Sequence, residues 1–273
     1  MLHDLSRLNN DRIVPLLASH QIWDNYCLLF PLADFNLYEY WTQTDPAIDL
    51  RKYTAWFVNE TKGLMQALSM LHRVPRNDPD PSLNSCPETE LSLVGIIHGD
   101  IKPSNILVYR DKQGTQPRLK WNDFGLSNWA DTEPKFRTTR TYDAPENGMR
   151  SKLGKKSDVW SFGCVLIDFA VWLLHGHDGV HVFGARRSMK TPGSGIPLKD
   201  DHFYTLVYSN QQQIGAIVRA AVSSELENII QDERCKGDFE HVIRLVSEEM
   251  LVVDENVRQD SDQLAQALED LAG

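Results

Sequence analysis

The sequence predicts an α+β fold, and three features carry this prediction. Short apolar runs bounded by prolines and polar turns, typical of strands, lie at the start of the chain and around residues 93–121. An amphipathic pattern over 50–71 indicates a long helix on the surface of a core. A nearly continuous apolar stretch over 158–174 indicates a helix inside the core. A strand-rich start followed by a helical body is the order expected of an α+β protein.

The N-terminal elements are predicted from local pattern. Apolar runs over 13–19 and 25–32, joined by a polar turn, predict a hairpin with prolines near the strand edges. Residues 37–44 predict a short helix that ends at the Asp45-Pro46 pair. The helix over 50–71 follows, with its apolar residues at spacings of three and four.

The middle and C-terminal elements follow in the same way. Residues 73–90 contain four prolines and few apolar residues, so we predict a surface insert over 73–91. Short strands are expected at 93–97, 106–109 and 118–121, and the buried helix at 158–174. The Gly-, His- and Arg-rich stretch 176–197 predicts a loop. Three helices are expected after it, within 211–230, at 239–251 and at 262–271.

Composition narrows the class of protein. The chain has 273 residues and 28 Lys+Arg against 38 Asp+Glu, a formal net charge of −10. An acidic chain without a basic run is a poor general binder of nucleic acid. Four cysteines without a C-x-x-C pair argue against a zinc site and a disulfide scaffold, and predict an intracellular location, cytoplasmic or nuclear. The apolar stretch that ends at Leu174 contains Asp168 and is shorter than the ~20 residues of a membrane span, so none is expected.

The chemistry is concentrated in the segment His98-Gly99-Asp100-Ile101-Lys102-Pro103-Ser104-Asn105-Ile106-Leu107 and in Asp123-Phe124-Gly125. Transfer of a phosphoryl group needs a cation to neutralise its oxygens and an acceptor that holds the attacking hydroxyl. Mg²⁺ prefers carboxylate and amide oxygens, which Asp123 and Asn105 supply. Asp100 could accept the hydroxyl proton, and Lys102 could hold a phosphate as a point charge. These residues predict a phosphoryl-transfer centre.

Two further motifs follow in the chain. Ala144-Pro145-Glu146 comes first, and Ser157-Asp158-Val159-Trp160-Ser161-Phe162-Gly163 opens the buried helix. Each motif alone is common in proteins, but the complete set in this order is rare. In this order the chain resembles a eukaryotic protein kinase of the serine/threonine type, from the third helix of the small lobe onwards.

The resemblance implies a role for each matching residue. Asp100 matches the catalytic base, Lys102 its neighbouring lysine, and Thr139 the threonine that contacts the base. Asn105 and Asp123 match the metal ligands, so ATP, Mg²⁺ and a protein substrate are implied. The remaining matches are structural: a stacked column of Leu5, Leu16, His98 and Phe124, followed by Gly125; Asp158 anchoring the catalytic loop; and Arg258 pairing with Glu146.

The resemblance also locates the adenine site. Phe30 matches the gatekeeper, and the carbonyl of Pro31 and the amide of Ala33 are expected to face the adenine. Proline lacks an N–H but keeps its carbonyl, so it fits a position that only accepts. Leu107 is expected to form the lower face of the adenine slot.

Some of the family's pattern is not found. Gly99 stands where an arginine is usual, no glycine precedes Gly63 and no lysine precedes Lys52, so the Gly-rich loop and the strand lysine are missing. Met1 falls at the position of the helix glutamate. The expected organisation is a remnant small lobe over 1–33, with third helix, fourth and fifth strands and hinge, and a mostly helical large lobe over 34–273. Impaired activity is expected.

Two other functions fit parts of the pattern. A pseudokinase-like binding module would keep the fold without catalysis, and the missing loop and lysine favour it. A small-molecule phosphotransferase also carries His-Gly-Asp followed by Asn, but Lys102, Thr139 and the Ala-Pro-Glu motif argue against it. A protein serine/threonine kinase remains the main prediction.

Overall fold

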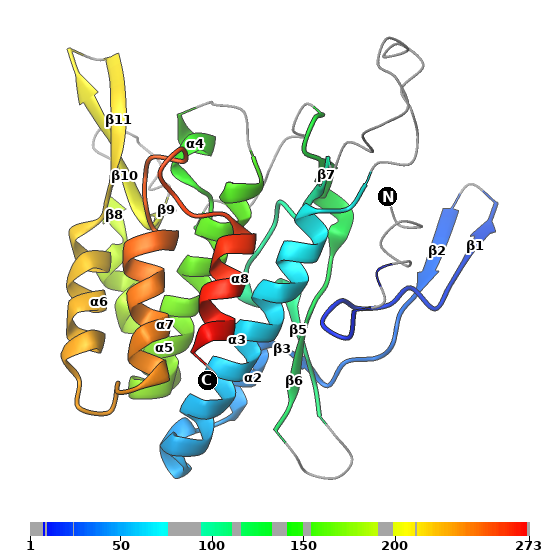
Figure 1. The fold of residues 1–273 in the computed structure, drawn as a ribbon, viewed down its shortest axis with the longest axis horizontal. Helices are drawn as coiled ribbons and strands as arrows, with labels where there is room; N and C mark the ends of the chain where they lie inside the picture. Colours follow the sequence, from blue (N-terminus) through cyan, green and yellow to red (C-terminus); the bar gives the residue numbers. More distant parts are fainter. Residues whose placement is uncertain are drawn as a thin grey trace.

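The computed structural model describes residue 8 and residues 10–23, 25–75, 94–110, 116–132, 141–149, 154–190, 199–210 and 212–271. It shows a helical body with small antiparallel sheets around it (Figure 1). This content agrees with the predicted α+β class. The segments 98–107 and 123–125, which carry the predicted chemistry, lie in loops, 3₁₀ turns and short strands.

The helices account for most of the ordered secondary structure. Their bounds are α2 Leu37–Gln43, α3 Leu50–His72, α4 Pro145–Gly148, α5 Lys155–Arg187, α6 Ala220–Gln231, α7 Asp238–Leu245 and α8 Ser261–Asp270. Single 3₁₀ turns occur at η1 Pro46–Ile48, η3 Pro103–Asn105 and η4 Phe124–Leu126, and a π-helical turn, η5 Val246–Met250, follows α7. The expected helix at 239–251 is therefore divided, since α7 widens into η5.

The strands are short and pair antiparallel. A three-stranded sheet has the order β3 Phe35–Asn36, β5 Ile106–Tyr109, β6 Arg118–Trp121. The others are two-stranded: β1 Ala18–Ile22 with β2 Asn25–Leu29, β4 Ile96–Ile97 with β7 Asn128–Trp129, β8 Met189–Lys190 with β9 Lys199–Asp200, and β10 Tyr204–Ser209 with β11 Gln212–Val218.

Local signals explain where helices start. At α2 the Asn36 side chain accepts from the Glu39 N–H (2.9 Å), and Glu39 Oε2 accepts from the Asn36 N–H (3.0 Å). This capping box satisfies N–H groups that the first turn leaves without partners. Asp260 and Gln263 form the same motif at α8. The two helices therefore begin close to the predicted positions.

The first half of α5 is the centre of the core. It is buried at every residue from Ser157 to Leu174 and is surrounded by other helices and aromatic side chains. Among the described helices it alone is long and apolar enough to cross a membrane, by length and composition. Its most apolar window is 89% buried inside the fold, which is the environment of a core helix.

The prediction of a loop over 176–197 is wrong for its first part. Helical structure resumes directly after Gly176 and continues to Arg187. Gly176 itself is not helical (φ 68°, ψ −171°), so it separates two helical segments. The second segment is held because Phe183 and Arg187 are buried, which composition alone did not reveal. Residues 191–198 lie outside the described part.

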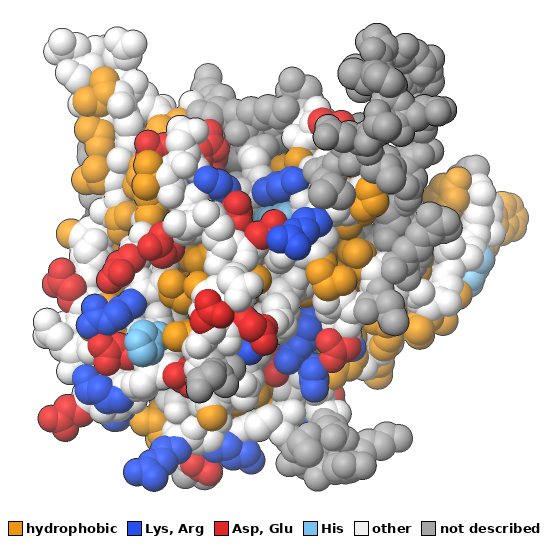
Figure 2. Space-filling view, in the orientation of Figure 1, with side chains coloured by type: hydrophobic (Ala, Val, Ile, Leu, Met, Phe, Trp, Pro, Cys, Tyr) orange, Lys and Arg blue, Asp and Glu red, His pale blue; other side chains and the backbone are white. Residues whose placement is uncertain are grey.

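Other boundaries also differ from the predictions. The N-terminal hairpin is present, but Ile13 forms only an isolated bridge to Trp121 and the regular strand starts at Ala18. The strand expected at 93–97 is confined to Ile96–Ile97. Of the surface insert expected at 73–91, residues 76–91 lie outside the described residues and Val74 is buried. The β10–β11 hairpin was not predicted. It projects from the body (Figure 1), and apolar side chains are visible on its surface (Figure 2). Ile214 and Ile217 of β11 are exposed.

Candidate active site

The site is built on the connection between β4 and β5. After β4, residues 98–100 turn through Gly99, whose φ of 83° lies in the left-handed region. The 3₁₀ turn η3 then leads into β5. Glycine adopts this backbone conformation without the strain that a side chain would add. The glycine found at position 99 therefore suits the turn that presents Asp100.

Asp100 is the centre of a polar cluster. Its carboxylate oxygen Oδ2 accepts hydrogen bonds from Lys102 Nζ (2.8 Å) and from Asn105 Nδ2 (2.8 Å). Asn105 Nδ2 also donates to the Asp100 carbonyl (2.8 Å). Asp100 and Asn105 are buried and Lys102 is half-buried. The structure thus brings together Asp100, Lys102 and Asn105.

Asp158 holds the loop from beneath. Its oxygens accept from the N–H of His98 (2.7 Å) and the N–H of Gly99 (2.9 Å). His72 Nε2 lies 3.1 Å from the same carboxylate. Burial alone would raise the pKa of Asp158, but the hydrogen bond from His72, the electrostatic attraction of His72 and the Gly99 N–H together lower it. Asp158 is therefore an ionised anchor for the backbone that precedes Asp100.

His98 connects this anchor to the 122–126 segment. Its ring packs on Phe124 with a centroid distance of 4.9 Å. Its Nε2 lies 3.0 Å from the Asn122 carbonyl, which can only accept, so Nε2 carries the proton. Burial lowers the pKa of His98, which favours this neutral form. Of the expected column, Leu5 lies outside the described residues and Leu16 is half-buried.

A backbone hydrogen bond joins the segment that contains Asp123 to the Asp100 cluster. The Asn122 N–H donates to the Asn105 carbonyl (3.0 Å), so residues 105 and 123 belong to adjoining segments. Asp123 has left-handed φ and ψ (60°, 71°), is exposed, and its Oδ1 accepts from the Gly125 N–H (3.2 Å). This conformation turns the carboxylate out at the start of η4.

The side chains of Asn105 and Asp123 offer the kinds of oxygen atom that Mg²⁺ prefers. Asn105 uses its amide nitrogen toward Asp100, which makes its amide oxygen the atom suited to a cation. Asp123 supplies a carboxylate. Among the described residues there is no group of three or more His, Cys, Asp or Glu side chains that could hold a metal. Mg²⁺ is commonly bound by one or two protein oxygens with water and substrate phosphates.

The segment expected to contact adenine runs along β5. The Asp34 N–H donates to the Val108 carbonyl (3.1 Å), and Asn36 pairs with Leu107. Ala33 thus directly precedes the residues that pair with β5, the strand that carries Leu107. Phe30 is partly exposed. The Pro31 carbonyl accepts a hydrogen bond from the Tyr109 hydroxyl (3.1 Å). This contact was missed by sequence reasoning, because no motif marks Tyr109.

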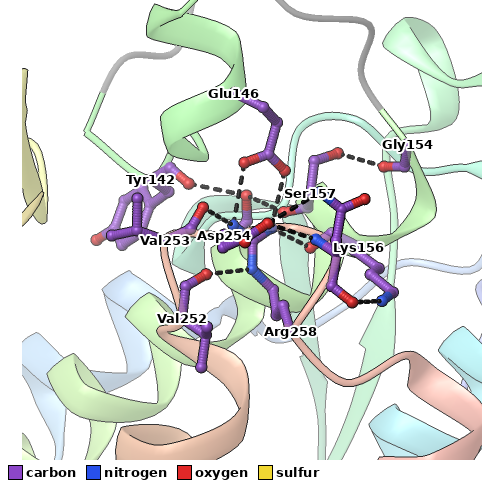
Figure 3. A network of polar contacts seen from close by, with 11 residues as sticks. Tyr142, Glu146, Gly154, Lys156, Ser157, Val252, Val253, Asp254 and Arg258 are labelled. Atoms are coloured by element: carbon purple, nitrogen blue, oxygen red, sulfur yellow. Dashed lines mark hydrogen bonds and ion pairs between the residues drawn. The ribbon is translucent and has the colours of Figure 1, made fainter. Parts of the chain in front are cut away.

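Glu146 and Arg258 form an ion pair, although they lie far apart in the sequence. Arg258 Nη1 and Nη2 donate to the two carboxylate oxygens of Glu146 (2.8 and 3.0 Å), and both side chains are buried (Figure 3). Arg258 also donates to the carbonyls of Val252 and Lys156, each at 2.8 Å (Figure 3). The pair therefore connects α4 to the start of α5 and to the turn before α8.

Thr139 lies outside the described residues, so the structure says nothing of its expected contact with Asp100. A second residue missed by the sequence is His72, at the end of α3. Its Nδ1 lies 2.8 Å from Ser261 Oγ while its Nε2 faces Asp158. The only sequence signal is its place in the last helical turn, which does not reveal a partner so distant in the chain.

Known proteins are similar to part of this chain. Residues 82–181 match the family described as protein kinase domain. A serine/threonine-protein kinase of Drosophila persimilis is 45% identical over 78 residues, which cover 28% of this chain and 10% of that protein. A PTI1-like tyrosine-protein kinase of Arabidopsis thaliana is 43% identical over 79 residues (27% and 20%). Mitogen-activated protein kinase 12 of Rattus norvegicus is 37% identical over 109 residues (38% and 27%). The chain thus matches from a tenth to about a quarter of each relative's length.

Proposed function

We propose that this chain, a member of the eukaryotic protein kinase family, transfers a phosphoryl group from Mg-ATP to a serine or threonine hydroxyl of a protein. The observation that carries the proposal is the hydrogen-bonded cluster of Asp100, Lys102 and Asn105. Specificity for serine and threonine is supported by the resemblance, in which Lys102 matches the lysine typical of serine/threonine kinases. One relative's name specifies tyrosine, so the experiment below includes both acceptors.

Each side chain has a distinct task in this proposal. Asp100 accepts the hydroxyl proton and orients the nucleophile. Lys102 contacts Asp100 and holds a transferring phosphate oxygen as a point charge. Asn105 and Asp123 supply the oxygens for Mg²⁺, which neutralises phosphate charge when bound. Positioning and electrostatics account for most of the catalysis in reactions of this class.

The adenine would lie beside the 30–33 segment. The carbonyl of Pro31 and the amide of Ala33 would pair with its edge, Phe30 would close the rear of the slot, and Leu107 would form its lower face. The Tyr109 hydroxyl occupies only part of the Pro31 carbonyl, since a carbonyl oxygen has two lone pairs. This arrangement is compatible with a bound base.

We also propose that these 273 residues by themselves transfer phosphate slowly. Among them no lysine precedes Lys52 and no glycine precedes Gly63. In the family, the Gly-rich loop and the strand lysine contact ATP, so other residues would have to make these contacts here. Residues 1–33 would then act as part of a small lobe and 34–273 as the large lobe. Free Cys27, Cys164 and Cys235 support an intracellular, cytoplasmic or nuclear location.

A transfer assay and a binding assay together test the proposal. The chain is incubated with radiolabelled ATP, Mg²⁺ and mixed peptides that carry Ser, Thr or Tyr. Slow transfer to Ser or Thr is expected, abolished in Asp100→Asn and Asp123→Asn and kept in Glu227→Gln, which alters an exposed carboxylate on α6. Calorimetry should show Mg²⁺-dependent ATP binding that Asp123→Asn weakens and Asp100→Asn keeps.

Three outcomes would contradict parts of this proposal. Mg²⁺-dependent ATP binding without transfer to any peptide would favour a pseudokinase-like binding module. Transfer to tyrosine alone would overturn the proposed specificity for serine and threonine. Transfer that survives Asp100→Asn would remove Asp100 from its role as base.

A further inference from the structure

Two histidines converge on the surface of α5, away from the candidate active site. His177 and His181 are one helical turn apart, in the segment that follows Gly176. Their Nε2 atoms lie 2.8 Å from each other, and their rings are nearly perpendicular (84°) with centroids 4.3 Å apart. Side chains at i and i+4 face the same side of a helix, so both nitrogens point to one spot.

We infer that His177 and His181 form a binding site for a transition-metal dication, and that Cu²⁺ is the ion it holds best. Imidazole is a common ligand for copper, nickel and zinc, and affinity is highest for Cu²⁺ among the first-row dications. The inference is independent of the proposed kinase function.

The distance between the two Nε2 atoms indicates which coordination geometry the pair favours. Metal–nitrogen bonds of about 2.0–2.1 Å at right angles place two nitrogens about 2.8–3.0 Å apart. A tetrahedral angle would need about 3.3–3.4 Å. In the metal-free protein this 2.8 Å separation is a hydrogen bond, in which one Nε2 donates to the other. An ion that displaces this proton finds the two nitrogens already at the spacing of neighbouring positions in a tetragonal complex. Tetragonal coordination by nitrogen and oxygen is characteristic of Cu²⁺ and Ni²⁺, and tetrahedral coordination of Zn²⁺.

The surroundings hold one ring in place. The Tyr38 ring from α2 packs edge-on to His177, with centroids 5.8 Å apart. Asp178 adds a negative charge next to the pair. A ligand already held in its binding orientation loses less entropy when the ion arrives.

Other features limit the affinity. In the described part of the chain, no third His, Cys, Asp or Glu completes a cluster with this pair. Water would fill the other positions. Ligation through Nε2 also leaves the proton on Nδ1, and in His177 this atom is buried without a hydrogen-bond partner. We therefore expect a weak, exchangeable site.

Calorimetric titration of the whole chain with Cu²⁺ in a non-chelating buffer tests the site. His177→Ala and His181→Ala should each weaken one binding event by about tenfold or more. His241→Ala, which removes an exposed histidine from α7, should leave that event unchanged. Electron paramagnetic resonance at one equivalent of Cu²⁺ should show two coordinated imidazole nitrogens in the wild type and fewer in either variant.

A spacing variant separates geometry from histidine content. The double change His181→Ala with Val182→His keeps the number of histidines but moves the second ring off the shared face; Val182 is itself exposed. Loss of the binding event in this variant, with an unchanged circular dichroism spectrum, is expected. The inference is overturned if the spacing variant or the His177→Ala/His181→Ala double variant binds Cu²⁺ as the wild type does. It is also overturned if Zn²⁺ binds the pair more tightly than Cu²⁺.

Discussion

Arg258 is joined to Glu146 by a bidentate ion pair that solvent does not reach: the side chains are 0% and 1% exposed. The guanidinium also donates to the Val252 carbonyl and lies 5.1 Å from the centre of the Trp160 ring. A buried charge needs such compensation, since its desolvation is costly. The pair thus fixes where the segment before α5 meets the C-terminal turn.

Arg258→Ala should destabilise the fold by about 3–5 kcal/mol, because it leaves the Glu146 carboxylate buried without a partner. Urea denaturation followed by circular dichroism measures the change. Arg244→Ala is the matched control, since Arg244 pairs with Glu240 on the exposed face of α7 (2.8 Å) and should contribute about 0.5 kcal/mol or less. Equal losses in both variants would contradict the structural role of Arg258.

The stability should fall as the pH is lowered from 7 to 5. Burial lowers the pKa of His98 in the folded state, so below about pH 6.5 the unfolded chain binds a proton that the folded chain resists. The free energy of unfolding then rises with pH through this range. Urea titrations at half-unit pH steps measure the slope, which should be smaller in His98→Asn and unchanged in His241→Asn. An equal slope in all three proteins would refute the assignment to His98.

Asp158 should contribute to the stability of the fold in a different pH range. Its pKa is lowered in the folded state, so its contribution is fully present above its ordinary pKa of 3.8 and is lost as the pH falls below it. Asp158→Ala should cost about 3–5 kcal/mol at pH 7, because the N–H groups of His98 and Gly99 lose their acceptor and His72 loses its partner. Asp143→Ala, in a half-buried loop, should cost less. A loss below about 1 kcal/mol for Asp158→Ala would contradict this role.

The parts of the fold that could be predicted are those with local signals. Lys102 and Asn105 lie within five residues of Asp100, so a short turn is enough to bring them together. The apolar pattern, with the Asp45-Pro46 pair after α2, located α2, α3 and α8 within one or two residues. Pairs distant in sequence, such as Arg258 with Glu146, were expected only from the family resemblance.

The parts that could not be predicted depend on tertiary packing. The contact of His72 with Asp158 joins the end of α3 to α5, and no local pattern marks it. The β10–β11 hairpin has mixed polar and apolar residues with weak alternation, so β10 was not recognised and β11 falls within the range 211–230 where a helix was expected. At Gly176 the sequence signalled a stop correctly, but burial of Phe183 and Arg187 restarts the helix at once.

Gly176→Ala tests this last point. The combination of φ 68° and ψ −171° is essentially restricted to glycine, so an alanine there should cost about 1–3 kcal/mol from backbone strain. A Cβ at this position would meet no atom within 4 Å, so collision adds nothing to the cost. Gly154→Ala is the matched control: its added Cβ also meets nothing, its φ is −114°, and the change should be near neutral. Urea denaturation of both variants measures the difference. If the two are equally stable, residues 155–187 form one continuous helix in solution, and the division of α5 at Gly176 is wrong.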